Sequence, residues 1–122
     1  MNSVLRIENY NEEGFYYSDS KVAIEMQEMD GRHPTPRNDS LLMRNYNKIE
    51  RDVKINDHMW RYSFSDMAQL NYWIYKDAWR ETLKEEGYVL NELYLYDDDI
   101  IIGYTQAMYN PSKEKNRKVI QW

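Results

Sequence analysis

The chain has 122 residues, with 16 Lys and Arg against 21 Asp and Glu, so its formal net charge at pH 7 is −5. This length is typical of one domain, and the negative charge excludes a protein that coats DNA or RNA through phosphate contacts. The sequence contains no cysteine, which excludes disulfides, thiolate zinc sites and cysteine nucleophiles.

The first half of the chain predicts short elements. Alternating apolar residues indicate a strand over residues 3–8, with Leu5 and Ile7 on one face. A turn over residues 9–14 and a short extended piece over 15–17 follow, and helical spacing predicts a helix over 20–28. Two further patterns are a proline-containing irregular segment over residues 32–39 and a short helix that begins near residue 41.

The second half predicts the principal elements. An extended piece over residues 59–64 precedes the principal helix over residues 65–86, for which Ser65 is the predicted N-cap and Gly87 the C-terminal cap. One bent helix and two short helices that break near Lys76 and Asp77 both fit this pattern. Residues 88–96 and 100–109 alternate and are joined by three aspartates, which predicts an antiparallel hairpin.

These elements predict a single α+β domain with a mostly antiparallel sheet, the principal helix packed on one face, and a C-terminal hairpin. We assign residues 1–111 to this domain and residues 112–122 to a basic C-terminal tail. The tail has four basic residues and one acidic residue, net +3, which leaves −8 for the rest of the chain. The longest apolar run is three residues, and the N-terminus lacks a signal-peptide pattern, so no membrane partner is expected.

The sequence carries no recognisable catalytic motif. It has neither a glycine-rich phosphate loop nor a G-x-S-x-G elbow. Its two histidines, His33 and His58, are far apart, and the aspartates at 97–99 lack the glycine and glutamate of a calcium loop. We therefore predict no metal, no cofactor and no enzymatic activity.

Arginines interleaved with aromatic residues are the most informative feature. Without a glycine-rich loop, phosphate recognition depends on arginine side chains, for which Arg6, Arg37, Arg61 and Arg80 are the candidates. Aromatic residues can stack on a base, so the combination favours a site for a small nucleotide and not a long nucleic acid. An aromatic core flanked by arginine stems is the alternative interpretation. The predicted ligand-binding residues are Arg6, Tyr16, His33, Arg37, Trp60, Arg61 and Gln106.

The order of several short motifs resembles a family of small proteins encoded by bacteriophages and prophages, and is similar to the phage anti-Thoeris sponges. The resemblance covers nearly the whole chain and depends on order and spacing, since none of the motifs is catalytic. Ser63-Phe64 stands where members usually have Gly-Phe. The motifs are Arg6-Ile7-Glu8 with Gly14-Phe15, the His-Pro-x-Pro-x-x-Asp segment at 33–39, residues 62–73, Glu86 to Val89, and Gly103 to Gln106.

The resemblance implies a non-catalytic protein that sequesters cyclic ADP-ribose signals of bacterial defence in the cytoplasm of the infected host. It also implies a homo-oligomer, a dimer or a hexamer, with the ligand held between subunits; some relatives take up cyclic oligonucleotides at a second site. Two other functions stay open. One is an ADP-ribosyltransferase-like enzyme in which Arg6 would bind a dinucleotide. Such an enzyme needs a catalytic Glu on a late strand, and this chain has Gln106 there, which argues against this function. The other is an inhibitor that binds a host protein through its acidic surface.

Overall fold

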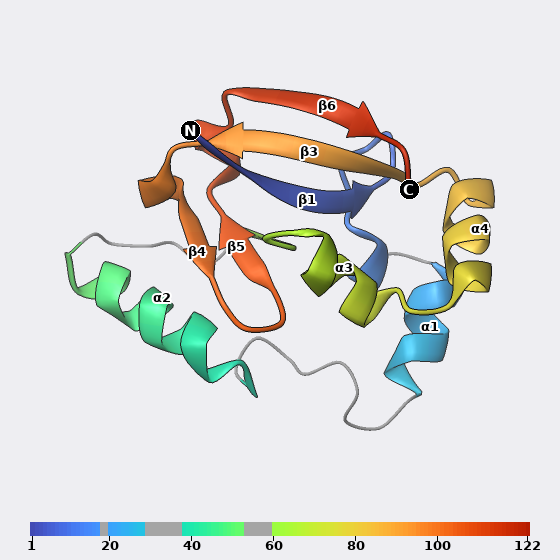
Figure 1. The fold of residues 1–122 in the computed structure, drawn as a ribbon, viewed down its shortest axis with the longest axis horizontal. Helices are drawn as coiled ribbons and strands as arrows, with labels where there is room; N and C mark the ends of the chain where they lie inside the picture. Colours follow the sequence, from blue (N-terminus) through green and yellow to red (C-terminus); the bar gives the residue numbers. More distant parts are fainter. Residues whose placement is uncertain (18–19, 29–37, 53–59) are drawn as a thin grey trace.

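The computed structural model describes residues 1–17, 20–28, 38–52 and 60–122. Its first sheet consists of β1 (Asn2–Glu8), β3 (Val89–Leu95) and β6 (Asn116–Ile120), antiparallel and in the order β1-β3-β6. In Figure 1 the strand β6 runs along the outer edge of this sheet, and β3 lies between β6 and β1.

The second sheet is smaller and consists of β2 (Arg61–Ser63), β5 (Ala107–Tyr109) and β4 (Ile100–Ile102), in the order β2-β5-β4. It is joined to the first sheet through an antiparallel bridge between Leu5 and Phe64. The two backbone hydrogen bonds of this bridge measure 2.7 and 2.8 Å. Phe64, which directly follows β2, therefore links the two sheets.

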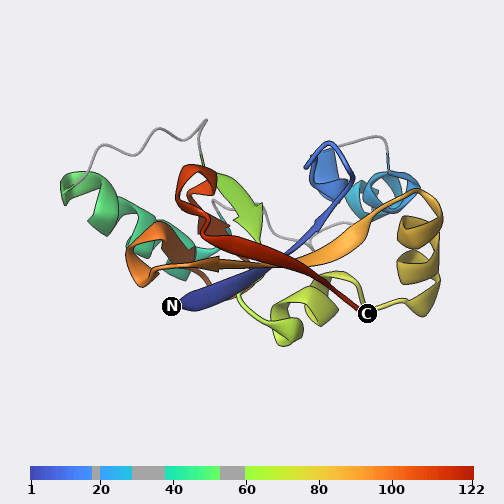
Figure 2. The same ribbon diagram turned by 90° about the horizontal axis from the view of Figure 1, so that it is seen from above.

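Helices lie at both ends of the molecule and one lies between them, as Figures 1 and 2 both show. The helix α2 (Ser40–Asp52) lies beside the second sheet. The helices α1 (Lys21–Gln27), α3 (Met67–Trp73) and α4 (Asp77–Glu85) pack against β1 and β3. Three short 3-10 helices, η1 (Phe15–Tyr17), η4 (Asp97–Asp99) and η5 (Pro111–Lys113), complete the described elements.

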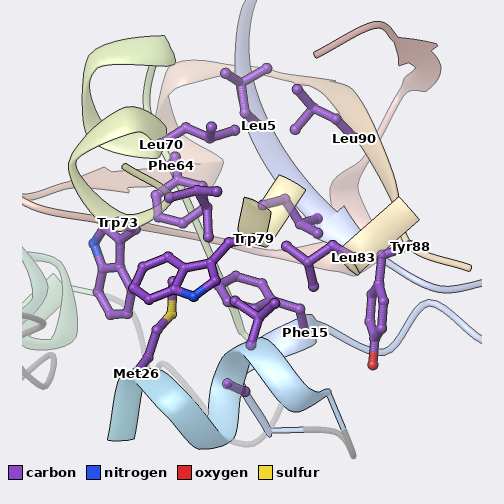
Figure 3. Close-up of a cluster of buried hydrophobic side chains, with 14 residues drawn as sticks. Leu5, Phe15, Met26, Phe64, Leu70, Trp73, Trp79, Leu83, Tyr88 and Leu90 are labelled. Atoms are coloured by element: carbon purple, nitrogen blue, oxygen red, sulfur yellow. The ribbon is translucent and has the colours of Figure 1, made fainter. Parts of the chain in front are cut away.

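The strands β1 and β3 of the first sheet bury side chains on both faces, whereas β6 is largely exposed. On one face, Leu5, Ile7 and Leu90 pack against the three helices, and Figure 3 shows Trp73 and Trp79 in this cluster. On the other face, a second cluster joins the two sheets, and a third joins the second sheet to α2. The second cluster consists of Val4, Leu93, Leu95, Ile100 and Tyr109, and the third of Leu42, Tyr46, Ile101 and Met108.

The predicted α+β class is confirmed, and the principal helix is two helices. The backbone leaves the helical conformation at Ile74, where φ is −104° and ψ is 71°, and α4 begins at Asp77. The predicted N-cap Ser65 is wrong: the Asp66 side chain accepts the hydrogen bond from the Gln69 backbone. Gly87 follows α4 with a φ of 90°, a conformation that glycine adopts without steric cost, as predicted.

Two further predictions of local structure are wrong. Residues 15–17 form a 3-10 helix and not an extended piece, because Phe15 and Tyr16 turn inward to reach the core. The strands β3 and β4 do not pair with each other; β3 pairs with β1 and β6, whereas β4 pairs with β5. The aspartates of η4 therefore carry the chain from one sheet to the other, and the true hairpin is formed by β4 and β5.

The basic C-terminal segment belongs to the first sheet. Five of its residues form β6, which pairs with β3 from Leu90–Ile120 to Tyr94–Asn116. The prediction of a separate tail missed this strand, because its charged residues interrupt the alternation of apolar and polar residues that indicates a strand. No helix among the described residues is long and apolar enough to cross a membrane.

Candidate functional site

A buried carboxylate lies at the end of β1, on the face opposite the helices. The side chain of Glu8 is fully buried, and it accepts hydrogen bonds from Arg6 Nε at 2.9 Å and from Asn91 Nδ2 at 2.8 Å. Arg117 of β6 donates at 2.6 Å to Oε1, the same oxygen that accepts from Asn91, whereas Arg6 uses Oε2. Three donors satisfy the hydrogen-bonding capacity that this carboxylate would otherwise lose on burial.

Arg6 is fixed in place by backbone contacts. Its Nη1 donates to the carbonyl oxygen of Tyr62 at 2.6 Å, and its Nη2 donates to the carbonyl oxygen of Glu12 at 3.3 Å. Gly14 lies directly against the guanidinium, since a Cβ at this position would be 3.0 Å from Nη2. A larger side chain at position 14 would crowd the Arg6 guanidinium, which explains why a glycine occurs here.

Arg117 forms the strongest ion pairs of the site. Its guanidinium donates two hydrogen bonds to Glu114, at 2.8 and 2.7 Å, in addition to the bond to Glu8. The hydrogen bonds to Glu114 raise the pKa of Arg117 above its usual value, and partial burial only partly offsets this increase. Paired bonds of this kind are stronger and more directional than single ones.

Arg61 of β2 completes the site from the second sheet. Its Nη1 lies 3.4 Å from the carboxylate of Glu12, whose other oxygen lies 3.5 Å from Arg117. Burial alone would lower the pKa of Arg61, but the neighbouring Tyr109 and Glu12 raise it overall. We call Arg6, Arg61 and Arg117 the arginine cluster; it brings together three strands and three carboxylates.

Tyr109 is buried beside the arginine cluster. Burial raises the pKa of its phenol, and Glu8 adds to the increase, whereas the charges of Arg6 and Arg61 oppose it. Its hydroxyl makes no hydrogen bond of ordinary geometry with the described residues, although Arg61 is close. A neutral phenol near the guanidinium groups of Arg6 and Arg61 is a potential hydrogen-bond donor to an anion.

Of the predicted ligand-binding residues that the structure describes, Arg6 and Arg61 are brought together in the arginine cluster. Trp60 packs against the cluster between β5 and α2, away from Arg61, because neighbouring residues of a strand point to opposite faces. Tyr16 packs edge-on against Trp73 with a centroid distance of 5.4 Å, as the alternative of an aromatic core predicted. Gln106 is buried in the loop between β4 and β5, and His33 and Arg37 lie outside the described residues.

Six residues of the site were not predicted from the sequence: Glu8, Glu12, Asn91, Tyr109, Glu114 and Arg117. A usable signal existed for Glu8, since strand alternation places it on the same face as Arg6. Arg117 could not be found, because finding it required recognising residues 116–120 as a strand next to β3. The candidate Arg80 is elsewhere, on α4, where it donates to Asn71.

A second polar cluster is centred on Asp39, which is buried just before α2. One of its oxygens accepts from the backbone N–H groups of Leu42 and Tyr104 at 3.0 Å, and the other accepts from the backbone and hydroxyl of Thr105 at 2.8 and 2.9 Å. Asp39 therefore caps α2 and fastens the loop between β4 and β5 to it. Each carboxylate oxygen of Asp39 already accepts two hydrogen bonds from the protein. We therefore assign this cluster a role in stabilising the fold and not in binding a ligand.

Within the described residues, no group of three or more His, Asp or Glu side chains is arranged to hold a metal ion. The carboxylates of the arginine cluster are instead paired with guanidinium groups. The arrangement is suited to binding an anion through arginine.

Comparison with known proteins agrees with the predicted bacteriophage origin. A family model described as Bacteriophage T4 Y00F protein matches residues 1–122. No curated protein and no solved structure matches the chain. Because the family model spans the residues of both sheets and all the described helices, the chain belongs to the Bacteriophage T4 Y00F protein family.

Proposed function

We propose that this phage protein binds a small phosphate-bearing nucleotide signal of bacterial defence, of the cyclic ADP-ribose class, and holds it without cleaving it. The observation that carries the proposal is the convergence of Arg6, Arg61 and Arg117 from three strands on one side of the first sheet. Guanidinium groups match phosphate oxygens through paired hydrogen bonds. The resemblance to anti-Thoeris sponges supplies the class of ligand.

The charges around the arginine cluster favour a small ligand. Three arginines face three carboxylates, Glu8, Glu12 and Glu114, so the site has little net charge. A polyanion would also meet the acidic surface of a chain whose net charge is −5. One or two phosphate groups can be accommodated here, whereas a long nucleic acid is disfavoured.

The bonding of the acidic groups favours binding over catalysis. Glu8 accepts hydrogen bonds from three donors, and Glu114 accepts from Arg117, so both carboxylates are already occupied by the protein. A general acid or base must be within hydrogen-bond reach of the proton that it transfers, and carboxylates occupied in this way are poorly placed for that role. Gln106, which stands where an ADP-ribosyltransferase-like enzyme would need a catalytic Glu, is buried in a loop.

Isothermal titration calorimetry with cyclic ADP-ribose isomers tests the proposal. We expect stoichiometric binding to the wild type, return of intact ligand after denaturation, and no release of nicotinamide from NAD. Arg61→Gln should weaken binding at least tenfold, since a charge-assisted hydrogen bond contributes about 1.5–3 kcal/mol. Arg44→Gln, an exposed arginine of α2 with the same change of charge, is the matched control. Absence of heat with every isomer, or equal losses in both variants, would contradict the proposal.

We further propose that two copies of the chain pair through β6. Among the described strands, none pairs with the outer edge of β6, and such an edge can accept another strand. With Val119 opposite its counterpart in an antiparallel pair, Lys118 would face Ile120 and Arg117 would face Gln121. A pair centred on Lys118 would instead oppose two lysines, which is unfavourable.

Light scattering after size exclusion tests this assembly. We expect the wild type to have at least the mass of a dimer. Val119→Lys places two lysines face to face and should yield a monomer, and since Val119 is 66% exposed the change leaves the core intact. Ile24→Lys makes the same exchange at an exposed position of α1 and should remain a dimer. A monomeric wild type would contradict the proposal.

The free edge of β6 also supports a second candidate function, the capture of an extended segment of a host protein. Strand addition of this kind relies on backbone hydrogen bonds along an unpaired edge. Pull-down from a bacterial lysate distinguishes the two: one stoichiometric host protein, bound independently of nucleotide, would favour an inhibitor.

A further inference from the structure

We propose that the carboxylate of Glu12 occupies the position of the ligand's phosphate, between Arg61 and Arg117, and leaves it when the ligand binds. This inference rests on the proposed function and adds the subsite and its occupant. The two oxygens of Glu12 are divided between the two arginines, one lying 3.4 Å from Arg61 and the other 3.5 Å from Arg117. A phosphate group presents its oxygens to two guanidinium groups in the same way.

The three carboxylates of the site differ in how firmly they are held. Glu8 and Glu114 contact arginine at 2.6 to 2.9 Å, and their side chains are 0% and 17% exposed. Glu12 contacts arginine only at 3.4 and 3.5 Å, and its side chain is 51% exposed. Long, solvent-exposed ion pairs contribute little to stability. Glu12 is therefore the replaceable carboxylate.

The turn that carries Glu12 keeps its shape without this carboxylate. The Asn9 side chain accepts from the backbone N–H groups of Asn11 at 2.9 Å and Glu13 at 3.1 Å, and the Asn9 carbonyl accepts from the backbone of Glu12. The bond from Arg6 to this turn also uses the Glu12 carbonyl and not its side chain. The carboxylate can thus turn toward solvent by side-chain rotation while the backbone and Arg6 stay in place.

When the Glu12 carboxylate leaves, the arginine cluster gains one unit of net positive charge, which a bound phosphate would neutralise. With Glu12 in place, three arginines face three carboxylates, and without it three arginines face only Glu8 and Glu114. The free guanidinium edges would belong to Arg61 and Arg117, whose side chains are 37% and 31% exposed. The fitting group is a diphosphate or a terminal phosphate, because it offers at least two charged oxygens to two donors that approach from different strands.

Titration with inorganic pyrophosphate, followed by ³¹P NMR, tests the inference. Glu12→Gln removes the competing charge and keeps the length of the side chain, so we expect it to bind pyrophosphate about three- to tenfold more tightly than the wild type. Glu13→Gln is the matched control, since Glu13 lies on the same turn and bonds to Asn9 and Asn11, outside the arginine cluster. It should bind as the wild type does.

The outcomes separate this inference from the proposed function. If the wild type binds cyclic ADP-ribose isomers but Glu12→Gln gains no affinity for pyrophosphate, Glu12 does not occupy the subsite, and the proposed function stands. If Glu12→Gln gains affinity for pyrophosphate but no isomer binds, the subsite stands and the proposed nucleotide is wrong. If neither protein binds pyrophosphate, or Glu13→Gln gains as much as Glu12→Gln, the subsite is wrong.

Discussion

Replacement of Asp39 by asparagine is the sharpest test of how this fold is held together. Asp39 uses both oxygens, one for Leu42 and Tyr104 and the other for the backbone and hydroxyl of Thr105. Asparagine keeps one acceptor but turns the other into a donor, which would face the Thr105 N–H group. A hydrogen bond to a charged group contributes about 1.5–3 kcal/mol, and the remaining oxygen loses its charge. We therefore expect Asp39→Asn to lower the free energy of unfolding by about 2–4 kcal/mol.

Urea unfolding at pH 7, followed by tryptophan fluorescence, measures this loss. The midpoint should fall while the m-value stays constant, because the surface exposed on unfolding is the same. Asp98→Asn is the control, since Asp98 is exposed in η4 and its replacement should change stability by less than about 0.5 kcal/mol. If Asp39→Asn costs no more than Asp98→Asn, the buried carboxylate does not fasten α2 to the β4–β5 loop.

The pH dependence gives an independent check. Burial alone would raise the pKa of Asp39, but the bonds from Thr105, Tyr104 and Leu42 bring it below the usual 3.8. A carboxyl whose pKa is lowered by folding contributes its stabilisation fully above the unfolded value, and this is lost as the pH falls through the folded value. The difference in stability between the wild type and Asp39→Asn should therefore be constant from pH 7 to about 5 and shrink below 3.8. A difference that grows on acidification would refute the reasoning.

The remaining predictions concern other buried contacts and use the same urea unfolding. Glu8→Gln leaves Arg6 and Arg117 without the buried charge that they share, and should cost about 3–5 kcal/mol; a loss below 1 kcal/mol would show that the two arginines find other partners. Gly103→Ala places a Cβ 2.5 Å from Asp39 Oδ2 and 2.6 Å from Leu42 Cβ, so we expect a loss of about 1–3 kcal/mol, and an unchanged midpoint would contradict this close packing. Gly87→Ala forces alanine into a φ of 90° and should cost about 1 kcal/mol, whereas a gain in stability would mean that the C-terminus of α4 rearranges.

Local patterns in the sequence predicted the helices better than the pairing of the strands. The helix α1 lies within the predicted range 20–28, because the helical spacing of Val22 and Met26 is a local signal. Strand pairing depends on contacts far along the chain, such as Arg6 opposite Asn91, which no local pattern reveals. The hairpin prediction failed for this reason: residues 88–96 and 100–109 are adjacent and alternating, yet they belong to different sheets.

In the candidate site, too, contacts within one strand could be predicted from the sequence, whereas contacts between strands could not. Alternation along one strand places Arg6 and Glu8 on the same face, so this pair could be predicted. Arg61 and Trp60, adjacent in sequence, were predicted to act together, but successive residues of a strand point in opposite directions, and only Arg61 reaches the arginine cluster. Arg117 joins the site only because β6 lies beside β3, a fact that depends on the whole fold.

Three of the motifs that carry the resemblance converge in space at the loop between β4 and β5, whereas the motif Arg6-Ile7-Glu8 with Gly14-Phe15 contributes Arg6 and Glu8 to the arginine cluster. Asp39 ends the motif at 33–39, Gln69 and Trp73 belong to the motif at 62–73, and all three bond to the loop that begins at Gly103. Gln69 donates to the Gly103 carbonyl at 2.8 Å, Trp73 donates to the Thr105 carbonyl at 2.8 Å, and Asp39 accepts from Thr105. These motifs therefore describe the joint between α2, α3 and the second sheet, which any chain of this fold needs whatever it binds. Likeness in these three motifs is evidence for the architecture, whereas the proposed phosphate subsite uses Arg61, Glu12 and Arg117, which lie outside every motif. If the proposal is right, variation at Arg61 and Glu12, whose ion pair is long and exposed, would alter binding with the joint unchanged. Loss of Arg117 would in addition remove a donor from the buried Glu8 and from Glu114, and would therefore also lower stability.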